Sequence, residues 1–207
     1  MARSAPAEPT GVKILACDPA LRNWGLAKVV VNPLAGELAV LDLKLVKTES
    51  EAGKTVRKSS DDLRRATVAY KEVVEWVEWA DLIAAEVPSG SKSARATLGA
   101  GISIGLLACF GQMRPLVQVN PIEVKKIVTG RKTAAKDEVI EWAVARFPKA
   151  PWLRERDKPT GRLVDANEHL ADAVAIAHAA IATPEFGAAV AMQQSFARGV
   201  ALQGARC

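Results

Sequence analysis

Two acidic side chains in this sequence occur where buried strands would end. Asp18 follows the apolar run VKILAC, and Glu86 closes a second apolar run, LIAAE. An acid that ends a buried strand is positioned by rigid backbone at a sheet edge, which is where α/β folds place their sites. We therefore expect Asp18 and Glu86 to face a common site.

A third group of candidate residues lies on one helical segment near the C-terminus. Asp165, Glu168, His169 and Asp172 are spaced i, i+3, i+4 and i+7. At about 100° per residue these four positions share one helix face, while the opposite stripe is apolar. The pattern predicts an amphipathic helix that adds carboxylates and one imidazole to the site.

This set of residue types is typical of a site for hard divalent cations. Carboxylate oxygens with one imidazole nitrogen are suitable ligands for Mg²⁺, with Mn²⁺ as the alternative ion. Crowded carboxylates repel one another unless cations lie between them. Two such ions per site can activate a water and stabilise the leaving oxygen during attack on a phosphodiester. The residues thus indicate metal-dependent phosphodiester hydrolysis.

Each residue also has a purely structural interpretation. Asp18 precedes a proline and could be a turn residue. Glu86 could only solvate a strand end, and Asp165 is placed to cap the helix that it begins. A histidine beside acids, such as His169, is often an exposed ion-pair partner. The combination is more specific than any one of its members.

Composition and charge narrow the class of protein. The 207 residues are 49% hydrophobic and 25% charged, which is typical of one globular domain. Three cysteines without a paired motif favour a reducing cytoplasm over a disulfide framework. No export signal is evident, and the apolar stretch at 98–110 looks too short to cross a membrane.

The basic residues are concentrated in one segment. The net charge is +5, yet residues 125–162 hold eleven Lys/Arg against five Asp/Glu. A basic segment on a nearly neutral body favours an anionic partner, and nucleic acid is the usual one.

The hydrophobic pattern predicts how the elements are ordered. Strands are expected at 12–17, 24–31, 37–46, 81–87 and 116–119. Helices are expected at about 60–77, 93–110, a short one from 121, 133–147 and 165–182. An antiparallel meander followed by strands that alternate with helices indicates an α/β fold with a mixed five-stranded sheet flanked by helices. We divide the chain into a leader (1–11), one domain (12–183) and a tail (184–207).

Four segments resemble the RuvC-type Holliday junction resolvases, which are ribonuclease H-like nucleases. In chain order the segments are ILACDPALRNWGLAKV, LIAAEVPSGSKSARATLGAGISIGLL, VNPIEVKKIVTGRKTAAKDEVIEWA and HLADAVAIAHA. They cover roughly residues 13–180. Each motif alone is weak, but their order is specific.

The resemblance implies roles for individual residues. It makes Asp18, Glu86, His169 and Asp172 both the catalytic residues and the metal ligands, with His169 standing where many members have Asp. It also implies contacts of basic residues with DNA, and we expect these from Arg22, Lys92, Arg95, Lys125, Lys126, Arg131, Lys132 and Lys136.

Two of the departures of this sequence from the family bear on how it would hold DNA. The aromatic wedge that follows the second catalytic acid is absent, because Val87, Pro88 and Ser89 fill that stretch. The segment 148–164 looks long, and its Trp152 with nearby arginines and lysines could make a substitute DNA contact.

The function that we expect is therefore a homodimeric, Mg²⁺-dependent endonuclease that nicks four-way DNA junctions symmetrically in recombination and repair. The alternatives are a broader nuclease of phage type for flaps and forks, and an inactive junction-binding protein. An actin-like ATPase is less compatible, since that family needs two such domains and this chain is short.

Overall fold

The computed structural model describes residues 10–33, 35–51, 53, 56–88, 93–133, 135–158 and 161–204, of which 157 and 196–204 are described by their backbone alone. Its centre is a five-stranded sheet in the order β3-β2-β1-β4-β5. The strands are β1 (Val12–Asp18), β2 (Asn23–Asn32), β3 (Glu37–Lys47), β4 (Leu82–Glu86) and β5 (Leu116–Val119). β1, β2 and β3 pair antiparallel, whereas β4 and β5 run parallel to β1. The expected mixed sheet is confirmed.

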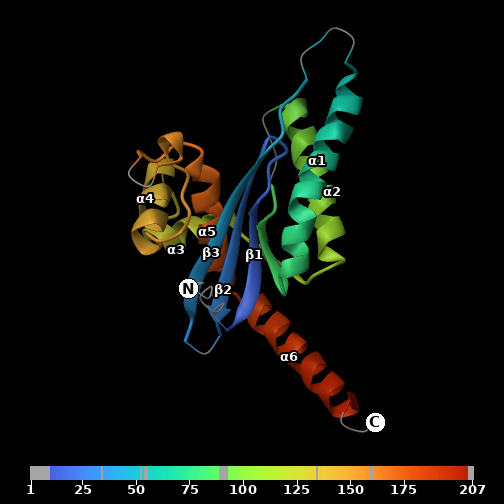
Figure 1. Ribbon diagram of the computed structural model, residues 1–207, viewed down its shortest axis with the longest axis vertical. Helices are drawn as coiled ribbons and strands as arrows, with labels where there is room; N and C mark the ends of the chain where they lie inside the picture. The colour runs from blue at the N-terminus through green and yellow to red at the C-terminus, as the bar shows by residue number, and fades with distance from the viewer. Residues whose placement is uncertain are drawn as a thin grey trace, which may run out of the picture.

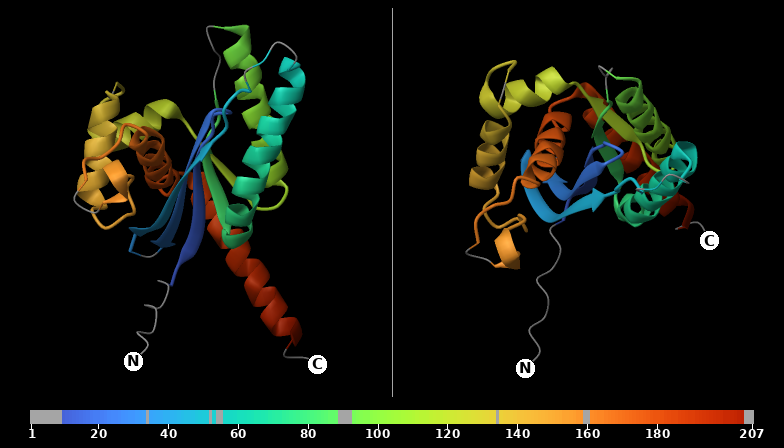
Figure 2. Two further views of the ribbon diagram at one scale, coloured as in Figure 1. Left: turned by 45° about the horizontal axis from the view of Figure 1, so that its top comes forward. Right: turned by 90° about the horizontal axis from the view of Figure 1, so that it is seen from above.

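Helices cover both faces of this sheet (Figures 1 and 2). They are α1 (Lys58–Trp79), α2 (Ala94–Gly111), α3 (Pro121–Thr129), α4 (Lys136–Arg146), α5 (Asn167–Ala180) and α6 (Pro184–Gly204). The pair α1 and α2 packs on one face and α3, α4 and α5 lie on the other, so the sheet has a separate apolar core on each side. The later part of α6 extends away from the body (Figure 1).

Helix α5 packs against the sheet with small side chains. Alanines and a few larger apolar residues, among them Leu170 and Val174, are fully buried in it. Short side chains allow the helix backbone to approach the strands closely. The helix consequently crosses the face of the whole sheet and contacts all five strands.

The closest approach occurs at Gly25 in β2, whose cross-strand partner is Asp18. A Cβ atom added at Gly25 would overlap the backbone carbonyl oxygen of His169. Only glycine leaves room for α5 here. The contact fixes the start of α5 beside the end of β1.

Two local expectations were wrong. Asp165 does not cap α5, because the helix begins at Asn167 and its N-cap is Ala166, without a side-chain cap. Trp152 is not available to stack on DNA, because its ring is buried and its Nε1–H donates to the Phe147 carbonyl.

The long segment before α5 is ordered by one buried amide. The Asn167 side chain accepts from Leu153 N–H and donates to the carbonyls of Leu153 and Val164. A short 3₁₀ helix (Glu155–Asp157) and a bridge between Arg154 and Leu163 complete the fold of this segment. The segment is therefore held at both of its ends by the helix that follows it.

The C-terminal segment also differs from an unstructured tail. Helix α6 starts at Pro184, and its Phe186 and Val190 are buried in the core on the α5 side. The Gln193 side chain donates to the backbone carbonyl of Asp81 just before β4. The first half of α6 thus packs with the rest of the fold, while the proposed division at residue 183 stays a prediction.

Helix α2 is more apolar than the sequence suggested. It spans 18 residues and is long and apolar enough to cross a membrane by those criteria alone, as is α5 joined to the start of α6. α5 is a core helix, but only Ser103, Leu107 and Phe110 of α2 are buried. Much of the apolar surface of α2 therefore faces outward, which is typical of an interaction surface.

We predict that Gly25→Ala lowers the free energy of unfolding by about 1–3 kcal/mol, because α5 must move to relieve the overlap with the His169 carbonyl. Urea denaturation measures this. Gly105→Ala in α2 is the control, since nothing lies within 4 Å of its added Cβ and it should gain roughly 0.5–1 kcal/mol. Equal stability of both variants and wild type would contradict the role of Gly25.

Candidate active site

The strand register places the two strand-end acids next to each other. Cys17 of β1 pairs in parallel with Ala85 of β4, so Asp18 and Glu86 follow at the same edge of the sheet. Burial, reinforced by the neighbouring Asp18 charge, raises the pKa of the Cys17 thiol, so this thiol stays protonated and is not a nucleophile. The chemistry at this edge therefore belongs to the acids.

His169 joins this edge through a hydrogen bond to Asp18. Its Nδ1 lies 2.8 Å from Asp18 Oδ2, and its Nε2 lies 3.2 Å from the Asn23 side-chain nitrogen. In the tautomer that satisfies both contacts, Nδ1–H donates to Asp18 and Nε2 accepts from Asn23. The bond to Asp18 raises the pKa of His169 above its ordinary value. The ring is thus held at both nitrogens.

Asp172 lies one helical turn after His169 and is the most perturbed acid of the site. Desolvation is the main cause, and the charges of Asp18, Glu168 and Glu86 add to it, so that the pKa of Asp172 rises to about 7. These electrostatic effects show that the acids of β1, β4 and α5 lie close enough to repel one another.

The pKa of Glu86 is also raised. Burial and the Asp18 charge raise it, while Lys125 acts in the opposite direction. Lys136 forms an ion pair with Glu168, and this bond raises the pKa of the lysine. Two cations from the predicted basic set, Lys125 and Lys136, therefore lie within electrostatic range of the acids.

The donor set fits a divalent cation in its chemistry. Asp18, Glu86 and Asp172 offer carboxylate oxygens whose mutual repulsion a cation would offset. Within the residues that the structure describes, no three acidic, histidine or cysteine side chains already form a closed cage for an ion. Ion binding therefore requires the carboxylate oxygens to come closer together than they lie here, and His169 could ligate only if Asn23 released Nε2.

The other predicted DNA contacts are distributed around this edge. Arg22 is exposed beside His169. Arg95 and Arg131 form ion pairs, with Asp62 and Glu138 respectively. Lys132 is exposed on the turn before α4, whereas Lys92 lies outside the described residues.

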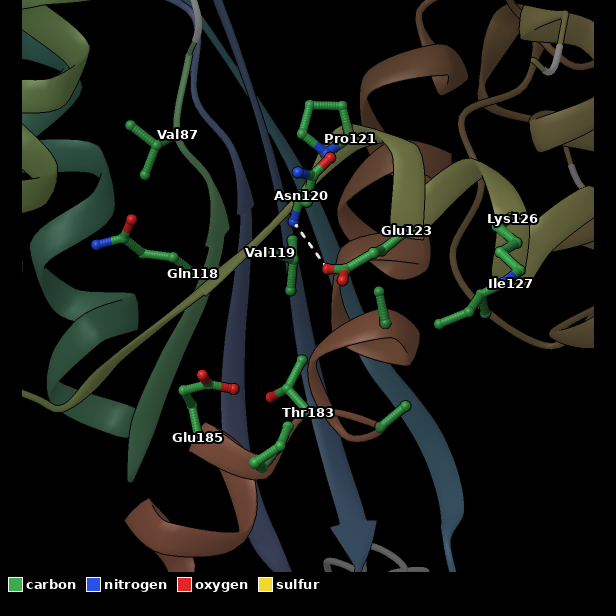
Figure 3. Close-up of a pocket in the computed structure, with 13 residues that line it drawn as sticks. Val87, Gln118, Val119, Asn120, Pro121, Glu123, Lys126, Ile127, Thr183 and Glu185 are labelled. Atoms are coloured by element: carbon green, nitrogen blue, oxygen red, sulfur yellow. Dashed lines mark hydrogen bonds between the residues drawn. The ribbon is translucent and has the colours of Figure 1, made fainter. Parts of the chain in front are cut away.

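A groove of about 850 Å³ extends from this edge along β5 and contains Lys126 (Figure 3). The start of α3 forms one wall, where Asn120 caps the helix and Glu123 accepts from the Asn120 N–H in return, at 3.4 Å. Thr183 and Glu185 line the groove from the start of α6. Its charged lining residues are Glu123, Lys126 and Glu185.

Comparison with known proteins decides the family. No family model matches the chain. The crossover junction endodeoxyribonuclease RuvC of Synechococcus sp. (strain WH7803) is 30% identical over 132 residues, which make up 63% of this chain and 80% of that protein. The chain belongs to the RuvC family. It is therefore a nuclease of the hydrolase class.

Solved structures of RuvC-family proteins and other resolvases share the fold. RuvC of T. thermophilus in complex with a Holliday junction substrate superposes with a TM-score of 0.57 at 22% identity, covering 81% of this chain and 92% of that one. The yeast mitochondrial Holliday junction resolvase Ydc2 gives 0.56 at 13% identity, covering 95% and 87%. The expected ribonuclease H-like fold class is confirmed.

One residue of this RuvC-family site was not anticipated. Asn23 is the first residue of β2, and its amide orients the ring of His169. The available signal was its position. Asn23 is a polar residue at the start of a strand, two positions before Gly25, and Gly25 is the cross-strand partner of Asp18. The partner itself is 146 residues away in sequence, which no local pattern reveals.

We predict that Asp172→Asn stabilises this RuvC-family protein in metal-free buffer at pH 8. The folded pKa of about 7 lies above the unfolded value of 3.8, so wild type loses stability as the pH rises between those values and pays the whole penalty above pH 7. The neutral amide of Asp172→Asn removes this penalty, so the free energy of unfolding should exceed that of wild type by on the order of 2 kcal/mol at pH 8, and the difference should vanish below about pH 4. Thermal melts in EDTA across this range measure the difference.

Addition of Mg²⁺ supplies the control for that measurement. The melting temperature of wild type should rise with Mg²⁺, because the cation offsets the carboxylate repulsion, and that of Asp172→Asn should rise less. An equal response of both proteins would show that Asp172 does not contribute to ion binding.

Proposed function

We propose that this protein is a divalent-metal-dependent endonuclease that nicks four-way DNA junctions, cutting two opposed strands from the two sites of a homodimer. The observation that carries the proposal is the crowding of Asp18, Glu86 and Asp172 at one sheet edge in a RuvC-family chain. A relative named as a crossover junction endodeoxyribonuclease supports the substrate. DNA recombination and repair in the cytoplasm of a bacterium or a phage-infected cell is the corresponding role.

The side chains of the site divide the work of hydrolysis. Asp18, Glu86 and Asp172 would hold Mg²⁺ or Mn²⁺, two ions per site, and these supply Lewis acidity toward the phosphate and the attacking water. His169 orients the Asp18 carboxylate through its Nδ1–H, and its Nε2 can take up a proton from the water once Asn23 releases that nitrogen. The products would carry 5′-phosphate and 3′-hydroxyl ends.

Lysines near the acids would neutralise the phosphate backbone. Lys125 lies within electrostatic range of Glu86, and Lys136 lies beside Glu168 and within range of Asp172. Lysines placed so close to carboxylates keep the local charge balanced when no DNA is present. They can turn to a phosphate when DNA approaches.

The outward face of α2 supports the homodimer. Leu98 and Ile104 are 51% and 41% exposed, and an apolar groove of about 700 Å³ lies between α2 and Leu63 of α1. A second copy of the same helix could bury this surface around a two-fold axis. Two-fold symmetry would also match the symmetry of a four-way junction.

A second candidate function is a broader nuclease that cuts flaps and forks. The sequence that follows Glu86 carries Val87, Pro88 and small polar residues in place of an aromatic wedge. Without that wedge, opening of the junction centre has to rely on other contacts. Cleavage rates on a junction, a flap and a bubble of matched sequence separate the two functions, because a resolvase cuts only the junction efficiently.

We predict paired nicks in a labelled four-way junction with Mg²⁺, none with EDTA and none in the matched linear duplex. Asp18→Asn should lower cleavage by at least about 10³-fold, because the amide is a poor ion ligand, and should leave junction affinity nearly unchanged. Gel analysis of the products and gel shifts in EDTA measure the two quantities. Full nicking by Asp18→Asn would refute the site assignment, and binding without cleavage by wild type would favour an inactive junction-binding protein.

We predict that Leu98→Glu converts the dimer into monomers, because a charge at an apolar interface is costly to bury. Light scattering measures the mass in solution. The control is Ala145→Glu, which adds the same charge at an exposed position on α4. Dimers that persist in Leu98→Glu would show that α2 is not the interface.

A further inference from the structure

A small pocket opens beside the acidic edge on the side of α2. The turn between β1 and β2, from Pro19 to Arg22, lines it, and so does Pro88, two residues after Glu86. Gly99 and Ala100 of α2 form an apolar surface within it. Its volume is about 330 Å³, which is at the lower end of the range for ligand pockets and is suitable for one nucleotide unit.

Three arginines line this pocket, and one carboxylate balances them. Arg95 donates through both terminal nitrogens to Asp62, and Arg65 Nη1 lies 3.9 Å from the same carboxylate. Arg22 is exposed and, among the described residues, its side chain has no ion-pair partner. The pocket therefore carries a net positive charge next to the catalytic acids.

Arg65 is only 6% exposed, which makes it the most informative of the three. Its Nε and Nη1 donate to the hydroxyls of Thr48 and Ser50 at 3.1 and 3.2 Å, and no described group accepts from its Nη2. The neighbouring Asp61 is engaged by Arg64. Hydroxyls orient a guanidinium without neutralising it, and the nearby Asp62 carboxylate is shared with Arg95, so the site retains positive charge for an additional anion.

We propose that this pocket binds the DNA nucleotide next to the scissile phosphate, with its phosphate on Arg22 and Arg65 and its sugar and base against Gly99 and Ala100. Arg22 also lines a second pocket, of about 300 Å³, on the His169 side. The cleaved strand can therefore pass beneath Arg22 from one pocket to the other across Asp18. This subsite rests on the proposed function, because it assumes that the catalytic edge cuts DNA.

The chemistry of the walls makes this contact independent of DNA sequence. Among the described lining residues, the polar side chains are arginines, and the others are proline, alanine, glycine and leucine. Such walls can hold a sugar or any base by shape, while guanidinium groups bind phosphate oxygens. The pocket therefore positions the strand rather than reading its bases.

Methylphosphonate substitution provides the test. Junctions and single-stranded oligonucleotides each carry one neutral methylphosphonate near the cleavage position, and affinity is measured in EDTA. For wild type, one such position next to the scissile phosphate should weaken binding about tenfold. For Arg22→Gln the same methylphosphonate should weaken binding much less than it does for wild type, because only Arg65 then faces that phosphate, and the dependence of log affinity on log salt should become shallower by about one.

Two further variants test the shape of the pocket. Ala100→Leu fills it without changing a charge and should slow junction cleavage in Mg²⁺ about tenfold. The controls are Ala145→Leu on an exposed part of α4 and Lys71→Gln on an exposed part of α1, which match the added volume and the lost charge. Arg65 is left intact because it is buried in the fold.

The outcomes separate the subsite from the reaction. If wild type cuts junctions while Arg22→Gln and Ala100→Leu behave like their controls, the subsite is wrong and the proposed function stands. If wild type cuts no junction but Arg22→Gln still shows the smaller methylphosphonate effect on single strands, the subsite stands and the proposed reaction is wrong. A wild-type protein that binds no DNA would overturn both.

Discussion

The close contact between α5 and β2 at Gly25 is the constraint on which the rest of the site depends. Because Gly25 pairs with Asp18 and supports the backbone of His169, one missing side chain sets the distance between β1 and α5. The alanines of α5 extend the same close packing across the other strands. Asp172 is then placed over the edge by helix geometry, one turn beyond His169. The acids are gathered by the core, since none of the hydrogen bonds described here joins one acid to another.

This arrangement makes the site a source of instability that the two apolar cores must offset. Burial and repulsion raise the pKa values of Glu86 and Asp172. In the absence of a cation, the ionised carboxylates are therefore less stable in the folded chain than they would be in water, which lowers the free energy of unfolding. A site whose carboxylates repel one another without a cation, and which cation binding would stabilise, is a common compromise between stability and activity. The buried faces of Trp24 and Phe110 on one side of the sheet and of Leu170 on the other supply the opposing free energy.

The parts of the fold that depend on local pattern could be predicted from the sequence. Apolar runs that end at Asp18 and Glu86 mark strands and their edge, and the 3.6-residue period marks α5. The contacts that join distant segments could not be predicted. The bond between Arg95 and Asp62, 33 residues apart, is one example, and the DNA contact predicted for Arg95 stays a prediction. Trp152 looks available for stacking, but its place in the core depends on how α4 and α5 pack.

The amide of Asn167 has a consequence for how such an enzyme can diversify. It fastens both the entry and the exit of the segment before α5, at Leu153 and Val164, to the first turn of the helix that carries His169. The stretch between those two points is therefore anchored at both ends whatever its own length. Residues there can be lengthened, shortened or recharged without shifting the catalytic geometry. The segment therefore behaves as an interchangeable module, through which substrate preference could evolve while the chemistry stays constant.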